Sequence, residues 1–490
     1  MPVIYEIINE PDTGPAGSHP PAGLYEKFPG GMKMEEKRYL KLGTKICYGM
    51  GDTSWCFISM VISSFMLIYL TDAQGMSSAI VGTLMLVARV FDGVTDVLFG
   101  RILDKTHTKW GKARPWQFVS MIGCAIALIL LFSMPESMGD SAKYVYFFIF
   151  YMLCNTVFYT FGYIAYSTLM SLMTRNAQEQ VESASFRTIG GNLGYCVLGI
   201  ITVPLVAAFG GGATGYRTLA IVYGIAGFIL NTISVFICKE IPEEEMKADA
   251  PAEEAVNKEK LGPVLKSVLK CKYFYFMILI MMILYLFAGV WQTSGVYYAT
   301  YALGNANFTS LLSGVNYGVT MCAAFIVPFV TKKVDPRKAA IIGLAIGIVA
   351  RAFAAFGGIG RNVSIILIGM AIATIGTAFI QTLAYSMMGS TSEYIFLKDG
   401  VRANGIVFSC TSMGNKIGQG IGTALCGVWL SASGYVANAA QQTDSCINML
   451  TFMYLIFPII CNVAIFIITC FCDVDKQLVG IKKEKGLIQG

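Results

Sequence analysis

Two carboxylates and a guanidinium share one face of an otherwise apolar segment. Arg89, Asp92 and Asp96 lie in the run "RVFDGVTDVLFGR", and their spacing of i, i+3 and i+7 places them on one side of a helix. Thr95 adds a hydroxyl group on a neighbouring edge of that helix. One arginine cannot neutralise two carboxylates, so we expect a residual negative charge that a cation or a proton completes.

The oxygens of Asp92, Thr95 and Asp96 lie within about one helical turn. Hard cations prefer such oxygen ligands, so we predict a cation site here, with Asp92 and Asp96 as the metal ligands if the ion is Na⁺. The alternative is a buried ion pair between Arg89 and Asp92 that only joins two helices. That alternative leaves the second acid unexplained.

The surroundings of this helix are predicted from composition. Only 13% of the 490 residues are charged and the mean hydropathy is +0.61, whereas soluble domains carry about 25% charged residues. The chain is therefore expected to lie in a lipid bilayer. The net charge of +6 shows no basic footprint for nucleic acid. Charged residues inside membrane spans cost about 2.5–3.5 kcal/mol each and are functional by default.

Apolar runs of at least about 20 residues predict an all-α membrane protein with twelve transmembrane helices. The predicted spans are 46–71, 77–103, 113–134, 143–173, 187–209, 217–238, 273–303, 308–331, 338–357, 362–390, 402–432 and 447–472.

Charge sets the expected orientation. Of the 36 Lys and Arg residues, 29 fall on the side that holds both termini and three on the opposite side, so both termini are predicted to be cytoplasmic in the plasma membrane. The charged stretch between spans six and seven divides two six-helix halves, an arrangement typical of transporters. The predicted parts are a disordered N-terminal segment 1–40, an N-terminal half 41–238, a cytoplasmic linker 239–272, a C-terminal half 273–472 and a cytoplasmic tail 473–490.

Further charged residues lie within predicted spans, and of these Arg101 and Arg351 are nearer the helix ends. Lys416, in "TSMGNKIGQGIGTAL", lies deep in an uncharged helix, where a functional role competes with extension of its side chain toward the cytoplasm. Asp52 lies about 10 Å into its helix at 1.5 Å per residue, so a solvated, a structural and a functional role all stay open.

Several motifs resemble one transporter family. "YGMGD", "YLTD", the acid pair of span two and the loop "GRILDKTHTKWGKARPW" are similar to the glycoside–pentoside–hexuronide:cation symporters of the major facilitator superfamily, which include melibiose permeases. The resemblance implies the major facilitator fold and a coupling-cation site at Asp92 and Asp96, with further oxygens from Thr95 and Thr160. It also implies that Lys416 lies between the cation and sugar sites, and that Arg187 lies near the cytoplasmic gate.

The sequence departs from melibiose permeases at three sugar-binding positions. Cys56 stands where the acid of span one is expected, Tyr163 where the acid of span four is expected, and Gln381 where span ten carries a tryptophan. The galactoside-binding set is therefore largely absent. With two acids replaced and Lys416 kept, the cavity is expected to be less acidic, which favours a uronide or another acidic glycoside.

These observations favour a secondary transporter that moves a sugar, glycoside or uronide with Na⁺ or H⁺ by alternating access. We expect a functional monomer with a small-molecule substrate, a coupling cation, no cofactor and no nucleic-acid partner. The alternatives are a membrane channel and a membrane-embedded enzyme, in which the ion cluster is purely structural. No TVGYG filter motif is visible, and the two histidines lie outside the apolar spans, which offers little to build a catalytic site.

The orientation can be tested with a cysteine placed in 250–256. An impermeant thiol reagent should label it in inside-out vesicles and not in intact cells. Labelling from outside intact cells alone would contradict the predicted topology.

Overall fold

The computed structural model describes residues 38–242 and 261–485, apart from 136, 175, 332, 333 and 402. Within these residues every regular element is a helix. Most of the predicted disordered segment 1–40 and the middle of the linker, 243–260, lie outside the described residues. At the end of that segment, the backbone amides of Tyr39 and Leu40 each donate to Glu179 at 3.0 Å.

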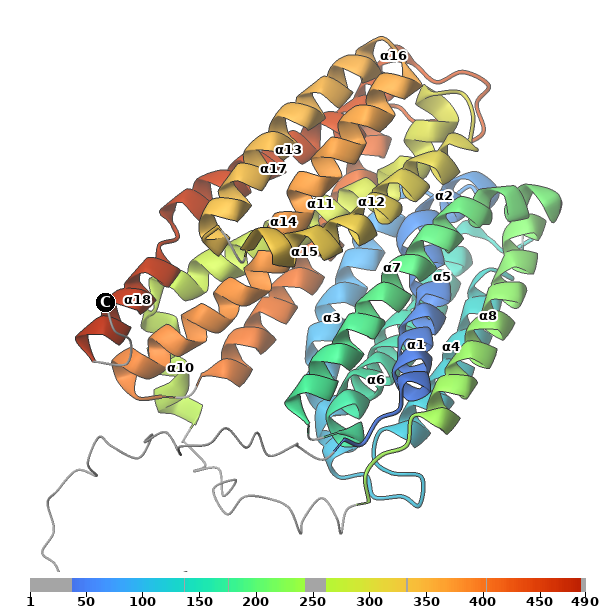
Figure 1. Cartoon of the computed structure of the whole chain (residues 1–490). Coiled ribbons are helices and arrows are strands. Elements are labelled where there is room, and N and C mark those ends of the chain that lie inside the picture. The colour runs from blue at the N-terminus through green and yellow to red at the C-terminus, as the bar shows by residue number, and fades with distance from the viewer. Residues whose placement is uncertain are drawn as a thin grey trace, which may run out of the picture. The chain divides into compact units, whose positions relative to one another are not determined.

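The first group of helices extends from α1 to α8 and appears in blue to green in Figure 1. Its elements are α1 (Leu42–Met60), η1 (Val61–Phe65), α2 (Met66–Ile68), η2 (Tyr69–Ala73), α3 (Ser78–Asp104), α4 (Arg114–Leu131), α5 (Asp140–Tyr151), η3 (Met152–Tyr159), α6 (Thr160–Met173), α7 (Ala177–Ala208) and α8 (Gly212–Ile237).

The second group extends from α10 to α18 and appears in yellow to red. Its elements are α10 (Leu261–Lys270), α11 (Lys272–Tyr297), η5 (Tyr298–Ala302), α12 (Phe308–Thr331), α13 (Pro336–Ile359), α14 (Val363–Asp399), α15 (Asn404–Ala432), α16 (Asp444–Thr451), η6 (Phe452–Ile456), α17 (Phe457–Phe471) and α18 (Val474–Glu484). The η segments are π-helical turns that continue the neighbouring α-helices.

Each predicted span coincides with one continuous helical segment, and the all-α prediction is confirmed. In the described part of the chain, nine segments are long and apolar enough to cross a membrane. The other three predicted spans correspond to α3, α12 and α15, which have 27, 24 and 29 residues. α3 carries Arg89, Asp92 and Asp96, and α15 carries Lys416.

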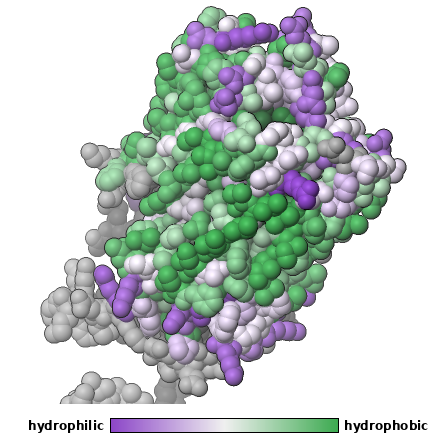
Figure 2. All heavy atoms as spheres, turned by 90° about the vertical axis from the view of Figure 1, so that its right-hand side faces the viewer, coloured by the Kyte–Doolittle hydropathy of each residue, from purple (hydrophilic) through white to green (hydrophobic). Residues whose placement is uncertain are grey.

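Large apolar side chains cover the outside of the bundle. Ile221, Ile225, Ile229 and Ile233 recur every four residues along α8, and they are 36–53% exposed. Figure 2 shows a broad hydrophobic zone across one face, with hydrophilic residues gathered above and below it. Exposing so large an apolar surface to water would be costly, whereas the hydrocarbon chains of lipids solvate it without penalty.

Two short helices lie where loops are predicted. α10 falls within the predicted linker and buries Val264 and Val268, while Lys266 and Lys270 are exposed. α18 occupies the predicted tail and packs against α14, where Lys482 pairs with Glu393 at 2.7 Å. Both helices are amphipathic and too short to span a bilayer.

Glycines bring α15 against the backbone of α11. A Cβ atom on Gly418 would lie 2.3 Å from the carbonyl oxygen of Met282, and one on Gly422 would lie 2.4 Å from that of Leu286. Small residues allow such close contact between membrane helices. α15 also packs along α3 of the first group, so it lies between the predicted cation helix and α11.

Replacing Gly418 by alanine should therefore force α11 and α15 apart and lower the free energy of unfolding by about 1–3 kcal/mol. Gly414→Ala is the matched control on the same helix. A Cβ atom added there would lie 3.6 Å from its nearest heavy atom, the carbonyl oxygen of Ile278, which is an ordinary contact distance. Thermal unfolding of the detergent-purified variants measures the difference. Equal stability of the two variants would refute the close packing.

Candidate functional site

Asp96 of α3 pairs with Lys416 of α15. The ammonium nitrogen lies 2.6 Å from both carboxylate oxygens, Oδ1 and Oδ2. Both side chains keep partial exposure, 29% for Asp96 and 23% for Lys416. This ion pair joins the first helix group to the second across 320 residues of sequence.

Asp92 lies one turn earlier on α3 and is fully buried. Its Oδ2 atom accepts hydrogen bonds from Arg89 at 3.4 Å and from the side-chain amide of Asn155 at 3.1 Å. Its Oδ1 atom is buried without a hydrogen-bond partner among the described residues. An unsatisfied carboxylate oxygen in this position retains the capacity to accept a proton or to coordinate a cation.

The residual negative charge predicted from the sequence is not found in this arrangement. Arg89 faces Asp92 and Lys416 faces Asp96, so two carboxylates meet two cations. The prediction was wrong because spacing along α3 reveals only the charges of that helix. The second basic partner comes from the other half of the chain.

The two predicted threonine ligands make helix-internal hydrogen bonds. Thr95 donates to the carbonyl oxygens of Phe91 and Asp92 at 3.2 and 3.1 Å. Thr160 donates to the carbonyl oxygen of Asn155 at 3.1 Å, and Asn155 in turn holds Asp92. Both hydroxyl oxygens still have lone pairs that could accept or coordinate.

A second charged cluster lies between α1, α6 and α7. Arg187 donates from Nε to Asp52 at 3.3 Å, and the hydroxyl of Tyr163 donates to the same oxygen at 3.3 Å. The guanidinium carbon lies 5.0 Å from the ring centre of Tyr163 and 5.1 Å from that of Tyr166. Of the predicted substrate or coupling residues, Asp52, Tyr163 and Arg187 are therefore brought together.

Cys56 lies one turn beyond Asp52 and is buried against α7. Its thiol donates to the carbonyl oxygens of Asp52 and Gly191 at 3.3 and 3.4 Å. It is a small residue packed at the contact between α1 and α7, and it does not line the cavity that α7 and α11 to α14 enclose.

The cavity between α7 and α11 to α14, here named the main cavity, has a volume of about 350 Å³. The predicted substrate residue Gln381 lines it, whereas the carboxylates of α3 do not. Most of its wall comes from α11, α12, α13 and α14, and α7 contributes the rest; the polar and aromatic lining residues include Asn192, Tyr195, Tyr285, Trp291, Gln292, Asn316, Tyr317, Arg351, Thr374, Thr377 and Gln381.

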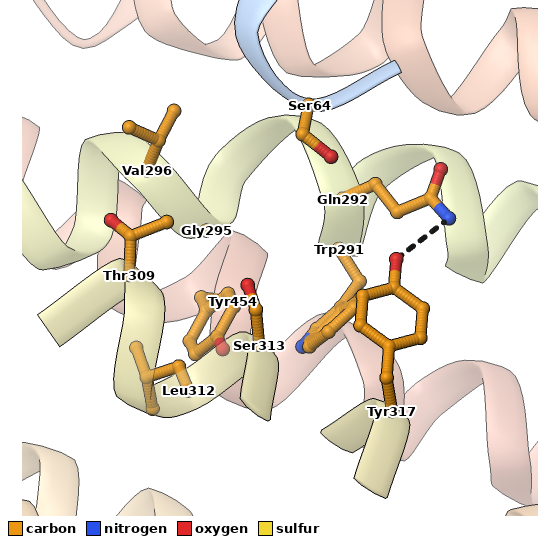
Figure 3. Close-up of a pocket in the computed structure, with 10 residues that line it drawn as sticks. All are labelled: Ser64, Trp291, Gln292, Gly295, Val296, Thr309, Leu312, Ser313, Tyr317 and Tyr454. Atoms are coloured by element: carbon orange, nitrogen blue, oxygen red, sulfur yellow. Dashed lines mark hydrogen bonds between the residues drawn. The ribbon is translucent and has the colours of Figure 1, made fainter. Parts of the chain in front are cut away.

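A small neighbouring pocket shares Trp291, Gln292 and Tyr317 with the main cavity. Figure 3 shows these side chains converging, with the Gln292 amide directed at the Tyr317 hydroxyl, a hydrogen bond of 3.4 Å. Gln292 also accepts from Gln419 at 3.5 Å. Gln419 lies one helical turn beyond Lys416 on α15, so these hydrogen bonds connect the helix that carries Lys416 to the cavity wall.

Sequence reasoning missed Asn155 as a partner of Asp92. The only signal was an isolated amide in the apolar run "YMLCNTVFYT". Asn155 lies in the π-helical segment η3, and π-turns often occur at functional sites. Arg351 was also underestimated, because its position in span nine suggested a helix end rather than a cavity wall.

Comparisons with known proteins agree with this architecture. The model of the family described as MFS/sugar transport protein matches residues 47–476. The chain belongs to this family. It is therefore a multi-pass membrane transporter of the sugar symporter type and not an enzyme.

Relatives cover nearly the whole chain. The isoprimeverose transporter of Lactiplantibacillus pentosus is 30% identical and covers 90% of both chains. The glucuronide carrier protein homolog of Escherichia coli is 27% identical over 85% of this chain and 91% of its own. A putative sulfoquinovose importer of Escherichia coli is 26% identical over 87% of this chain and 89% of its own.

Solved structures confirm the predicted major facilitator fold. The nucleoside transporter NupG has a TM-score of 0.59 at 14% identity, covering 87% of this chain and 98% of its own. A bacterial homolog of the lysosomal transporter Spinster has a TM-score of 0.60 at 11% identity, covering 89% of this chain and 96% of its own.

The charge balance at Asp92 can be tested by removing its cation. Arg89→Met should lower the free energy of unfolding by about 3–5 kcal/mol, because it leaves a buried carboxylate uncompensated. Adding Asp92→Asn should restore part of this loss.

Arg101→Met on the exposed end of the same helix is the control and should change stability by less than about 0.5 kcal/mol. Unfolding of the purified variants in detergent measures all four proteins. A double variant no more stable than Arg89→Met would contradict the pairing.

Proposed function

We propose that this protein is a symporter in which the coupling cation competes with Lys416 for Asp96. The observation that supports this is the ion pair between Lys416 and Asp96, which links the two helix groups. A side-chain ammonium occupies the place beside the carboxylate that a coupling ion would take. The ammonium group of Lys416 thus occupies part of the predicted cation site.

Either coupling ion would release this contact. Na⁺ would coordinate the oxygens of Asp92, Asp96, Thr95 and Thr160, whereas a proton would neutralise one of the carboxylates. In both cases Lys416 loses its counter-charge at Asp96 and must find other acceptors. At an effective dielectric of about 20, a single charge pair at 4 Å is worth about 4 kcal/mol, enough to bias a two-state equilibrium strongly.

The substrate is proposed to bind in the main cavity, between α7 of the first group and α11 to α14 of the second. Sugar binding there and cation binding at α3 are coupled through α15, which contacts both α3 and α11. The hydrogen bonds from Gln419 through Gln292 to Tyr317 connect α15 to the cavity wall. Linkage requires that each ligand raises the affinity of the other by the same factor.

Alternating access further requires contacts between the halves that can break. Asp72, at the end of the first span, accepts a hydrogen bond from Tyr301 at 2.5 Å and another from Tyr435. These tyrosines belong to the second group, so Asp72 closes the bundle at this end. We propose that this end faces outward and that both termini lie in the cytoplasm.

The names of the relatives support a sugar or glycoside as substrate, since they mention isoprimeverose, a glucuronide and sulfoquinovose. We further propose a plasma-membrane location, a functional monomer and the division into halves 41–238 and 273–472. The competing interpretation is that the ion pairs are purely structural.

Asp96→Asn separates the two interpretations. It keeps the size of the side chain and deletes the charge that holds Lys416. We expect a folded protein that still exchanges sugar across the membrane but no longer accumulates it against a gradient, and Asp92→Asn should behave alike.

In proteoliposomes, counterflow measures sugar exchange, and uptake driven by an imposed ion gradient measures accumulation. Asp140→Asn, an exposed acid at the start of α5, is the matched control. Ion-driven accumulation by Asp96→Asn with unchanged ion dependence would show that the pair is structural.

A further inference from the structure

Arg351 is a buried cation without a carboxylate. It lies on α13, is 5% exposed and lines the main cavity. Its Nη2 atom donates to the hydroxyl of Thr377 at 3.4 Å, and its guanidinium carbon lies 4.7 Å from the ring centre of Phe287. Its Nε atom is buried and has no hydrogen-bond partner among the described residues.

The other basic side chains deep within the bundle are all neutralised. Arg89 pairs with Asp92, Lys416 with Asp96 and Arg187 with Asp52. In the part of the chain that the structure describes, no acid lies within ion-pair distance of Arg351. Among the described residues, no aspartate or glutamate lines the main cavity either.

This arrangement is costly unless something in the cavity offsets it. Arginine stays charged in proteins, so it cannot escape the penalty by losing its proton. The attraction to the face of Phe287 is weaker than the penalty for burying an ion. An anionic group that enters the cavity would offset the cost of burying the guanidinium. A guanidinium can also bind a carboxylate through two parallel hydrogen bonds.

The rest of the wall suits the sugar ring of such a ligand. The amides of Gln292, Asn316 and Gln381 can donate and accept, as ring hydroxyls require. Tyr195 of α7 stacks on Tyr317 of α12 with ring centres 5.2 Å apart, which presents flat apolar surface from both helix groups. The volume of about 350 Å³ lies within the usual range of small-molecule sites.

We propose that Arg351 binds the anionic group of the substrate, and that the substrate is a sugar bearing a carboxylate or a sulfonate. This inference rests on the proposed function, since it takes the main cavity as the sugar site. It adds to the proposed function a residue, Arg351, that selects anionic over neutral sugars. A neutral sugar could also accept hydrogen bonds from Arg351, but it would leave the positive charge uncompensated.

Binding to the purified full-length protein tests this inference without any ion gradient. The probes are matched pairs, D-glucuronate against D-glucose and D-galacturonate against D-galactose, together with 6-sulfonated glucose. We expect at least one acidic member to raise the unfolding temperature, because ligands that bind only the folded state stabilise it. Its neutral partner should have a much smaller effect at the same concentration.

Arg351→Met should lower the affinity for the acidic sugar about ten-fold or more and abolish the preference for acid over neutral. Arg351→Lys, which keeps the charge but loses the fork, should retain part of that preference. Arg217→Met, which removes a cation that does not line the main cavity, is the control and should bind as the unchanged protein does. Stabilisation by sulfonate alone or by carboxylate alone identifies the anionic group.

Two results would overturn the inference. One is stabilisation by neutral sugars with no acidic member active, and the other is an acid preference that survives Arg351→Met. Absence of stabilisation by every acid in the panel also counts against it. Failure of the proposed function is a separate outcome, in which acidic sugars bind through Arg351 but no ion gradient drives their accumulation.

Discussion

The compensation of charge inside a low-dielectric bundle governs this structure. A single ion in hydrocarbon surroundings costs several kcal/mol even after relaxation, so an opposite charge beside a buried ion stabilises it. Asp92 with Arg89 and Asp52 with Arg187 are pairs within the first helix group. The pair of Asp96 and Lys416 differs, because its members belong to different groups and its carboxylate is more exposed than those of Asp92 and Asp52. Under the proposed function, an incoming ion would break this pair and with it a contact between the halves.

Backbone packing connects this pair to the cavity. α15 approaches α11 so closely at Gly418 and Gly422 that no side chain fits between them. On its other face Gly427 lies against Ser78 at the start of α3, where an added Cβ atom would meet the carbonyl oxygen at 2.3 Å. A helix held by backbone contact on both sides cannot shift alone, because close-packed surfaces change between discrete arrangements. A shift of α15 would therefore also move α11, which supplies Trp291 and Gln292 to the cavity.

The sequence predicted those features that depend on local periodicity or composition. The helical segments follow from apolar length, and the proximity of Arg89 to Asp92 follows from their spacing on α3. The partner of Asp96 could not be derived in this way, since Lys416 lies 320 residues away and only the folded chain brings the two together. Asn155 and Arg351 were missed for the same reason. Each looks like an isolated polar residue in an apolar run, and its role depends on which helix faces it.

If the cation binds at Asp96 and the sugar at Arg351 as proposed, the two sites together would determine what drives transport. A neutral sugar that moves with one monovalent cation carries a net charge, so the membrane potential adds about 2.3 kcal/mol per 100 mV to the driving force. An anionic sugar held by Arg351 would move with the same cation without net charge, so the ion's concentration gradient alone would supply the energy. The uncompensated guanidinium in the cavity thus bears on energetics as well as on specificity. By selecting an anion, Arg351 would make the transporter insensitive to membrane potential at a one-to-one ratio of sugar to cation.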